Sequence, residues 1–466
     1  MSLYDTILEN LPEVSKPTDR LTFKTKLIWT LIILVTFYLL QLIPLYGLGQ
    51  NALQTFELLS LILGAEFGSI ISLGIGPIVT ASIVLQLLNG SGIVKFDLQS
   101  TEGKKRFQGT QKILSLFFIL FEGAIYVFFG GLAPALDLQG TSLFLVMEIV
   151  LTAQLFVGGI LIMMMDEVCS KWGFGSGLSL FIAAGVSKSL FVRTFSPLPS
   201  PNNPEIMTGA IPALFQSLMA GDPTTAILML SGVIATGLIF AGAVYAQSMK
   251  VELPLSFGKV RGYGIRWPLN FMYTSNIPVI LVAALFANIQ LWARLLQNAG
   301  FPILGTFVGN SPATGFVSFI SAPNLVGTVI RQGTFFIGIK PYISALIYML
   351  LMLAGCIMFG LFWVQTSGMD ARSQAKQIMN SGLQIPGFRR DERILESILG
   401  RYIMPLTVMG SITVGLLAGF ADLMGALTNG TGLLLTVMII YKLYEDIARQ
   451  HMMDMNPMMR KFMGGE

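Results

Sequence analysis

Long apolar blocks are the feature of this 466-residue sequence that most restricts its fold. A mostly apolar stretch of about 18 or more residues can cross a bilayer as one helix. Charged residues make up only 12% of the chain, roughly half of their usual share in soluble domains, so they are too few to coat a water-facing surface, and a soluble enzyme is excluded. We predict an all-α membrane protein whose ten spans are residues 27–46, 70–88, 113–134, 142–165, 178–192, 225–247, 271–292, 342–364, 403–427 and 431–447.

The segment 51–69 is apolar in its middle but carries Glu57 and Glu66. If it does not span the membrane, 24 of the 29 Lys and Arg residues lie on the amino-terminal side, whereas only nine do so if it spans. Because basic loops accumulate in the cytoplasm, we predict that the segment enters the outer face and returns, and that both termini are cytoplasmic. Such a re-entrant segment must be surrounded by protein or line a wet cavity. The alternative is an interfacial surface helix.

The ten spans divide into five and five around the polar stretch 193–224. Because five is odd, the second half would sit inverted relative to the first, as in many transport proteins whose functional path lies between two halves. We therefore predict an N-terminal half over residues 1–200 and a C-terminal half over residues 201–466. A short match supports the division, since Gly-Pro-Ile-Val at 76–79 and Ile-Pro-Val-Ile at 277–280 lie early in corresponding spans.

Three predicted cytoplasmic loops, 89–112, 248–270 and 365–402, are long and net positive. Membrane topology and contact with anionic lipid account for this charge by themselves. The last two loops are nevertheless longer than a connection needs, and their basic clusters suit a polyanionic partner such as ribosomal RNA. Charge alone leaves the two interpretations equal. The clustered residues are Lys259, Arg261, Arg389 and Arg390.

Residues 1–20 contain an amphipathic stripe. Leu3, Ile7, Leu11 and Val14 recur at spacings of four, four and three residues, as on one face of a helix. We expect this segment to lie flat on the cytoplasmic membrane face or against a partner helix.

The sequence offers little for catalysis or for binding a metal or cofactor. His451 is the single histidine and lies outside the spans, so neither a zinc protease site nor a Ser-His pair can be built. An aspartyl protease needs two carboxylates that share a proton, and Asp422 has no second Asp in a span. We predict no enzymatic activity and no cofactor.

Two acidic residues are predicted in the middle of spans, Glu122 and Glu148. Ionisable groups at membrane depth are costly and often functional, so an ion-coupled secondary transporter built on inverted repeats is the alternative function. No Lys or Arg lies mid-span to pair with either residue, which makes a weak coupling site. A neutral, hydrogen-bonded Glu148 within the bundle is an equally good interpretation.

Spans two, five and ten are rich in small residues, which let helices approach closely. The Gly76-Pro77 pair also interrupts the backbone hydrogen bonds and permits a kink. Tight static packing accounts for the small residues, but not for the Ile, Val and Leu residues beside them. Those residues suit an aliphatic constriction that gates by dewetting.

Several long motifs resemble the SecY protein-conducting channel family, in its archaeal branch. They occur in the family's order over essentially the whole chain. They read SLGIGPIVTASIVLQLLNGSG, FQGTQK, SKWGFGSGLSLFIAAGVS, VELPLSFGKVRGYG, SNIPVILVAALFANIQLW and NGTGLLLTV. The resemblance implies a channel that passes unfolded secretory chains across the membrane and releases apolar segments sideways into lipid.

The resemblance also implies roles for individual residues. The family's short plug helix corresponds to residues around 53–66, which include Leu53, Phe56, Glu57, Leu61 and Glu66. Its aliphatic pore ring corresponds to Ile75, Val79, Leu178, Ile182, Ile280 and Leu435. The polar cluster of its lateral gate corresponds to Thr80, Glu122 and Asn288. The loops 248–270 and 365–402 correspond to the ribosome docking sites.

Partners and location follow from the same resemblance. The family works with a SecE-type (gamma) subunit and a small single-span beta-type subunit, and it receives nascent chains and signal sequences from the ribosome. The expected location is the cell (plasma) membrane, with lipid around the spans. The driving force comes from the partner, so no cofactor is expected.

Overall fold

The structure is a computed structural model that describes residues 10–455 with several gaps. The residues outside the description are 1–9, 20, 50–67, 91–92, 95, 98–99, 129–130, 136–139, 201–202, 258–263, 276, 299, 309–310, 334–337, 381–382, 385–390, 429 and 456–466.

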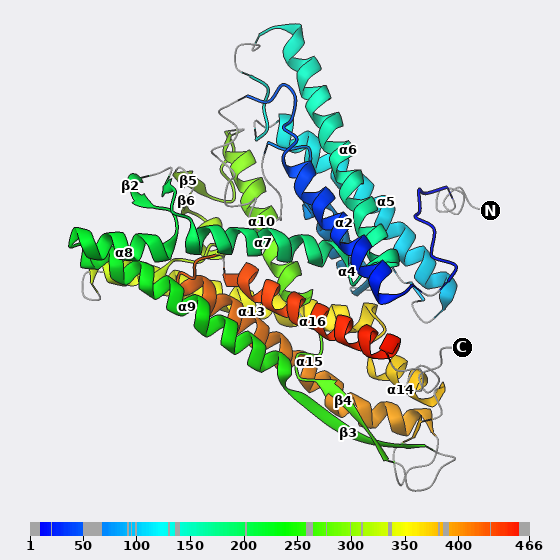
Figure 1. Ribbon diagram of the computed structural model, residues 1–466. Coiled ribbons are helices and arrows are strands. Elements are labelled where there is room, and N and C mark those ends of the chain that lie inside the picture. Colours follow the sequence, from blue (N-terminus) through cyan, green and yellow to red (C-terminus); the bar gives the residue numbers. More distant parts are fainter. Residues whose placement is uncertain are drawn as a thin grey trace.

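Long helices form the amino-terminal part of the molecule (Figure 1). They are α2 (Phe23–Gln41), α4 (Gly76–Gly90), α5 (Thr101–Phe128), α6 (Ser142–Trp172) and α7 (Gly177–Phe195). The hydroxyl of Thr22 accepts a hydrogen bond from Thr25 N and so caps the start of α2. Helix α6 packs against α2, α5 and α7, while α4 packs against α5.

The carboxyl-terminal part is a second helical bundle with shorter elements in its loops. The long helices are α9 (Pro223–Ser248), α10 (Ile277–Asn298), α13 (Ile339–Thr366), α15 (Glu392–Leu423) and α16 (Gly430–Met455). Asp222 caps α9 and is followed by Pro223 at the first helical position, where the missing N–H costs no hydrogen bond. The short helices are α8 (Ala210–Ala220), α11 (Val317–Ile320), α12 (Leu325–Gln332) and α14 (Ala371–Asn380).

Each of the ten predicted spans falls on one long helix, and the membrane-protein fold class is confirmed. Eight of these ten helices are long and apolar enough to cross a membrane within the described residues; α4 is shorter, and α16 is not among the eight. The predicted starts differ from the observed ones at α4 and α10, which begin at Gly76 and Ile277. Pro77 and Pro278 therefore lie in first helical turns, where proline starts a helix rather than kinking it. The kink expected at Gly76-Pro77 was the wrong interpretation.

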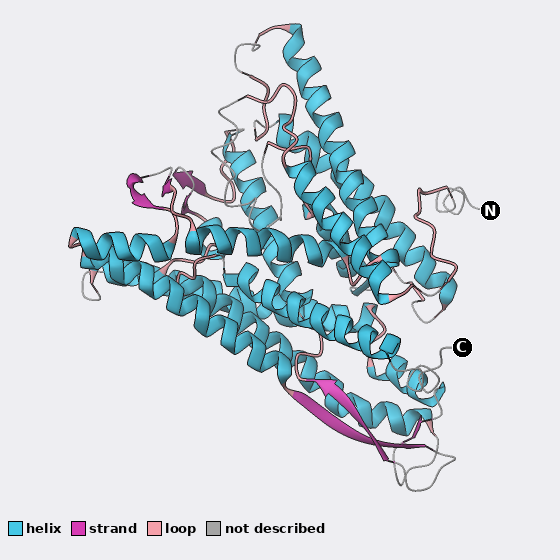
Figure 2. Ribbon diagram, in the orientation of Figure 1, coloured by secondary structure: helices cyan, strands magenta, loops and turns pink. Residues whose placement is uncertain are grey.

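Short antiparallel sheets add to the helices (Figure 2). The largest has the order β4-β3-β7, in which β3 (Lys250–Phe257) pairs with β4 (Gly264–Asn270) and with β7 (Leu383–Gln384). It joins the loop 248–270 to the loop 365–402, which are far apart in sequence. Two-stranded sheets are formed by β1 (Pro199–Ser200) with β2 (Asn203–Met207), and by β5 (Thr306–Val308) with β6 (Ser311–Thr314).

The two bundles meet along a few helices. Helix α7 packs against α16, and α4 packs against both α10 and α13. One apolar cluster of buried residues runs across these contacts and includes side chains from both bundles. The start of α2 and the end of α16 also meet, since Lys26 Nζ lies 3.5 Å from Gln450 Oε1 and the rings of Phe23 and His451 lie 5.2 Å apart.

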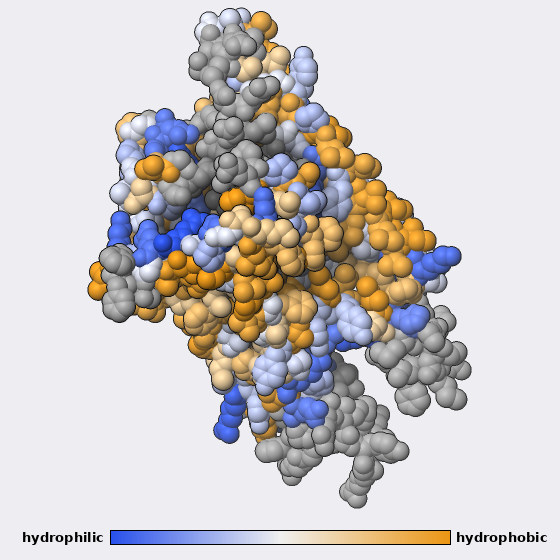
Figure 3. Space-filling view, turned by 60° about the vertical axis from the view of Figure 1, so that its left-hand side comes forward, coloured by the Kyte–Doolittle hydropathy of each residue, from blue (hydrophilic) through white to orange (hydrophobic). Residues whose placement is uncertain are grey.

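The outer flanks of the helices carry exposed apolar side chains. Figure 3 shows large apolar areas along the face in view, with hydrophilic residues gathered toward its margins. Val35 of α2, Leu145 of α6 and Leu238 of α9 are each 58% exposed. Apolar surface of this extent is costly in water and suits the hydrocarbon of a bilayer.

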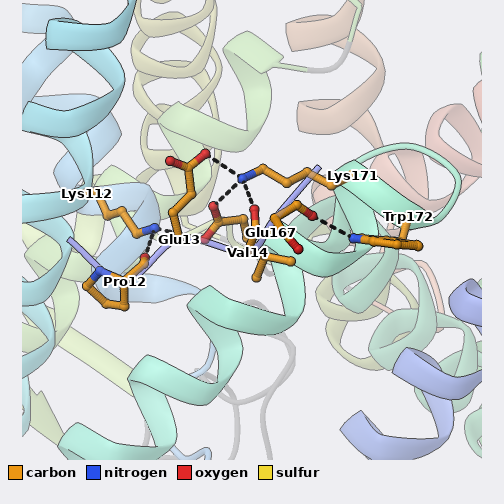
Figure 4. A network of polar contacts seen from close by, with 8 residues as sticks. Pro12, Glu13, Val14, Lys112, Glu167, Lys171 and Trp172 are labelled. Atoms are coloured by element: carbon orange, nitrogen blue, oxygen red, sulfur yellow. Dashed lines mark hydrogen bonds and ion pairs between the residues drawn. The ribbon is translucent and has the colours of Figure 1, made fainter. Parts of the chain in front are cut away.

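Residues 10–19 lie in an extended strap against α5 and α6 (Figure 4). Lys171 Nζ contacts Glu13 Oε1 at 2.6 Å and the carbonyl of Val14 at 2.5 Å, and Trp172 Nε1 donates to the carbonyl of Ser15 at 2.9 Å. Lys112 donates to the carbonyl of Pro12. The expected amphipathic helix is therefore wrong for residues 11–17, while Leu3 and Ile7 lie outside the described residues.

Candidate functional site

The six aliphatic residues predicted to form the ring come from four helices and converge in one apolar cluster. Ile75 directly precedes α4, and its carbonyl accepts a hydrogen bond from Val79 N at 3.1 Å. The side chains of Ile75, Val79, Ile182 and Leu435 are buried. Those of Leu178 and Ile280 are half-buried and pack against the cluster. All six side chains are apolar and deformable, and none of the six offers a polar group that could bind a ligand.

A cavity of about 480 Å³ lies against part of this set. Val79, Leu178, Ile182 and Ile280 contribute to its walls. The other walls come from the first part of α5, which supplies Gln108 and Gln111, and from the end of α13. The cavity therefore has mixed polar and apolar walls, and the aliphatic side chains form one part of them. Water and ions can fill the polar part, whereas narrow aliphatic passages exclude them.

The predicted gate residues Thr80, Glu122 and Asn288 lie together on α4, α5 and α10. Asn288 Nδ2 donates to Thr80 Oγ1 at 2.6 Å, and Thr80 Oγ1 donates to the backbone carbonyl of Gly76 at 2.9 Å. Glu122 is only 3% exposed, and its Oε1 atom has no hydrogen-bond partner in the described part of the chain. The bond from Asn288 to Thr80 crosses the contact between the two bundles, and a buried polar pair of this kind is strengthened by its apolar surroundings.

Gln111 joins α5 to α4 near the gate residues, although the sequence-based prediction did not include it. Its Nε2 atom donates to Ser82 Oγ at 2.7 Å, two residues beyond Thr80 on α4. Gln111 precedes Glu122 by 11 residues on α5, which is about three helical turns and places both on one face. That spacing is the sequence signal that could have identified it.

Glu148 occupies a different place from the one expected. It lies in the second turn of α6 rather than in the middle of the helix, and its side chain is half-buried. Its backbone carbonyl accepts a hydrogen bond from Thr152 Oγ1 at 2.8 Å. The two acids therefore differ in their surroundings, since Glu122 is buried and Glu148 is half-buried.

Two groups of predicted residues fall outside the described part of the chain. The first is the plug, with Leu53, Phe56, Glu57, Leu61 and Glu66. The second is the docking set, in which Lys259 and Arg261 lie between β3 and β4, and Arg389 and Arg390 lie between β7 and α15. Strands β3 and β4 flank Lys259 and Arg261, and β7 precedes Arg389 and Arg390. The sheet β4-β3-β7 therefore joins the chain segments next to both pairs of residues.

Comparisons with known proteins match nearly the whole chain. A family model described as SecY matches residues 69–444. The protein translocase subunit SecY of Pyrococcus furiosus is 43% identical over 470 residues, which cover 97% of each chain. A solved structure described as a protein-conducting channel has a TM-score of 0.81 at 40% identity and covers 96% of this chain and 97% of its own.

A further solved structure is Sec61 in the canine ribosome-channel complex from the endoplasmic reticulum. It has a TM-score of 0.78 at 40% identity and covers 96% of this chain and 97% of its own. The comparisons give no support to the alternative of an ion-coupled transporter. Because the family model covers most of the chain and the relatives align from end to end, the chain belongs to the SecY family.

Proposed function

We propose that this chain is the pore-forming subunit of a Sec-type protein translocation channel. It passes unfolded secretory chains across the membrane and releases transmembrane segments sideways into lipid. The observation that carries the proposal is the convergence of Ile, Val and Leu side chains from four helices beside a partly polar cavity. The named relatives are a protein translocase subunit and protein-conducting channels.

The aliphatic residues act as a ring that closes around whatever passes. A polar binding site fits one ligand, whereas soft apolar side chains can rearrange around many different ones. Ions stay out because a narrow aliphatic passage does not hold water. The plug around residues 53–66 adds a second obstruction in the resting channel. The driving force comes from the partner that delivers the chain, so the subunit needs no catalytic residue.

Lateral release uses the contact between α4 and α5 on one side and α10 and α13 on the other. The hydrogen bond between Asn288 and Thr80 crosses this seam at 2.6 Å. A single hydrogen bond contributes about 1 kcal/mol net, which an entering apolar segment offsets through burial of its own side chains. The seam therefore stays closed to polar chains and opens to apolar ones.

The partners are a SecE-type (gamma) subunit, a small beta-type subunit, and the ribosome with its nascent chain and signal sequence. The shared sheet β4-β3-β7 supports a docking surface, because it joins the two basic loops. Lys259, Arg261, Arg389 and Arg390 are the proposed contacts. The protein is a multi-pass membrane channel, and we place it in the cell membrane with both termini cytoplasmic, as the distribution of Lys and Arg indicates.

A crosslinking experiment tests the proposal. Single cysteines replace Val79, Ile182 or Ile280, and a secretory chain with one cysteine is stalled during translocation. We expect disulfides between the stalled chain and each of these positions, and none with the lipid-facing control Leu145→Cys, whose side chain is 58% exposed. Disulfides with the control alone would overturn the proposed path.

A further inference from the structure

Asp166 of α6 holds the start of the next helix, α7. Its Oδ1 atom accepts hydrogen bonds from Leu178 N at 2.9 Å and from Ser176 Oγ at 3.2 Å. Leu178 is itself one of the proposed ring residues. The first turn of α7 is therefore tied to the end of α6 at the position of the ring.

Asp422 of α15 does the same for α16. Its Oδ1 atom accepts hydrogen bonds from Gly430 N at 2.6 Å and Thr431 N at 3.3 Å. Its Oδ2 atom accepts from Thr431 Oγ1 at 2.8 Å and from the hydroxyl of Tyr348 on α13 at 2.7 Å. The ring residue Leu435 follows Thr431 by about one turn of α16.

The two arrangements match in sequence and in packing. Residues 175–178 read Gly-Ser-Gly-Leu and residues 430–433 read Gly-Thr-Gly-Leu. Each helix begins with a glycine that has no room for a side chain against the helix that carries the aspartate, although this glycine is third in the first motif and first in the second. A Cβ on Gly177 would lie 2.6 Å from Asp166 Cα, and one on Gly430 would lie 2.1 Å from Ala421 Cβ and 2.4 Å from Asp422 N.

The two helix starts lie at opposite ends of the molecule. Ser176 and Leu178 line the cavity near the start of α5 and the end of α13. Helix α16 instead ends beside β3, where Glu445 pairs with Lys250 at 3.2 Å, so its start lies at the far end. This is the relation expected for inverted halves. Helices α7 and α16 pack against each other between these ends.

These aspartates differ from ordinary helix caps. The first N–H groups of a helix lack partners within the helix and attract negative charge. Asp222 and Asp391 satisfy such groups from the residue directly before their own helices, α9 and α15. Asp166 and Asp422 do so from a preceding long helix, so each bond fixes one helix relative to another along the membrane normal.

We propose that Asp166 and Asp422 are paired positioning residues that set the height of α7 and α16 and so bring Leu178 and Leu435 into register with the ring. The inference rests on the proposed function, because it concerns the ring of that channel. A slip of one residue along a helix moves a side chain by about 1.5 Å and turns it by about 100°. Such a slip removes an aliphatic side chain from the ring without unfolding the helix.

The test compares Asp166→Asn and Asp422→Asn with the control Asp222→Asn. The control caps α9 through a similar set of donors, Thr224 N at 3.1 Å, Thr225 N at 3.3 Å and the hydroxyl of Thr225 at 2.5 Å, but α9 carries no ring residue. The full channel complex is placed in planar bilayers and its resting ion conductance is measured. We expect a several-fold rise in conductance for the first two variants and none for the control.

A second measurement reports position directly. Nitroxide labels on Phe191 of α7 and Ile440 of α16, which are 66% and 50% exposed, give the distance distribution between the two helices. We expect this distribution to shift or broaden in Asp166→Asn and Asp422→Asn and to stay unchanged in Asp222→Asn. If either variant fails to accumulate, Ser176→Ala and Thr431→Val remove one hydrogen bond each and should show smaller changes in the same direction.

Unchanged conductance and distances in all of these variants would overturn the inference. The crosslinking experiment above separates this failure from a failure of the channel itself. If a stalled chain reaches Val79 and Ile280 while the Asp166 and Asp422 variants behave like the control, only the positioning role is wrong. If the chain does not reach those positions in the unmodified protein, the proposed function fails.

Discussion

Ile280 is the residue of α10 that we propose for the ring, and its side chain is half-buried beside the cavity. We predict that Ile280→Asn raises the resting ion conductance in planar bilayers, because an amide offers hydrogen bonds that hold water in a passage otherwise kept dry. The matched control Ile280→Leu keeps an aliphatic side chain and should leave the conductance low. Equal conductance in the two variants would count against a role for this position in the seal.

The single residues differ in how well the sequence predicted them. The ring and gate residues were named from motif resemblance, and the structure brings them together, including Thr80 and Asn288 at a sequence separation of 208 residues. Asp422 was noted only as a possible catalytic acid, and Asp166 was not singled out. Their hydrogen bonds depend on the path of the turns 173–176 and 424–428, which hydrophobic periodicity does not encode.

At the scale of elements, the strap of residues 10–19 is held to α6 chiefly through Lys171. We predict that Lys171→Met frees the strap, because the substitution removes its ion pair with Glu13 at 2.6 Å and its bond to the carbonyl of Val14. A nitroxide on Thr18→Cys should become more mobile in its electron paramagnetic resonance spectrum. Lys16→Met changes the net charge equally and is the control; equal mobility in both variants would contradict the role of Lys171.

The same label gives a pH dependence. The hydrogen bond from Lys171, together with its positive charge, holds the pKa of Glu13 below the ordinary value of 4.5. The ion pair between Glu13 and Lys171, which is one part of the attachment, is therefore complete at neutral pH and is lost only as the pH falls through this lowered pKa. We expect the label to become mobile on acidification below about pH 4.5 in the unmodified protein, and to respond little in Lys171→Met.

The helices were easier to predict than the strands for a physical reason. A span needs a long apolar stretch, and each of the ten stretches contains most of one helix. The polar residues 101–112 nevertheless continue α5 beyond the membrane, because a helix need not end where its apolar stretch ends. Strands β3 and β7 pair with each other although their loops lie more than 120 residues apart in the sequence. A local sequence pattern does not predict a pairing at that distance.

On the scale of the whole molecule, the proposed lateral release requires the two bundles to separate at the seam. We predict that Thr80→Cys combined with Asn288→Cys locks the seam on oxidation, because the native side chains are in direct contact at 2.6 Å. The oxidised protein should keep a low resting conductance but lose insertion of transmembrane segments, and a reductant should restore it. Each single-cysteine variant is the control.

Full insertion by the oxidised double variant, with the disulfide demonstrated by gel mobility, would show that segments leave by another route. The native cysteines, Cys169 and Cys356, are both buried and free, so they leave this measurement undisturbed.

The proposed ring contacts of α7 have a consequence for how a chain moves through. Leu178 and Ile182 are four residues apart on α7, which corresponds to about 6 Å along the helix. An extended polypeptide advances about 3.3 Å per residue, so only about two of its residues touch the ring at any moment. The desolvation penalty and the friction of transport therefore stay constant however long the passenger is, and a charged residue crosses as a brief, isolated barrier.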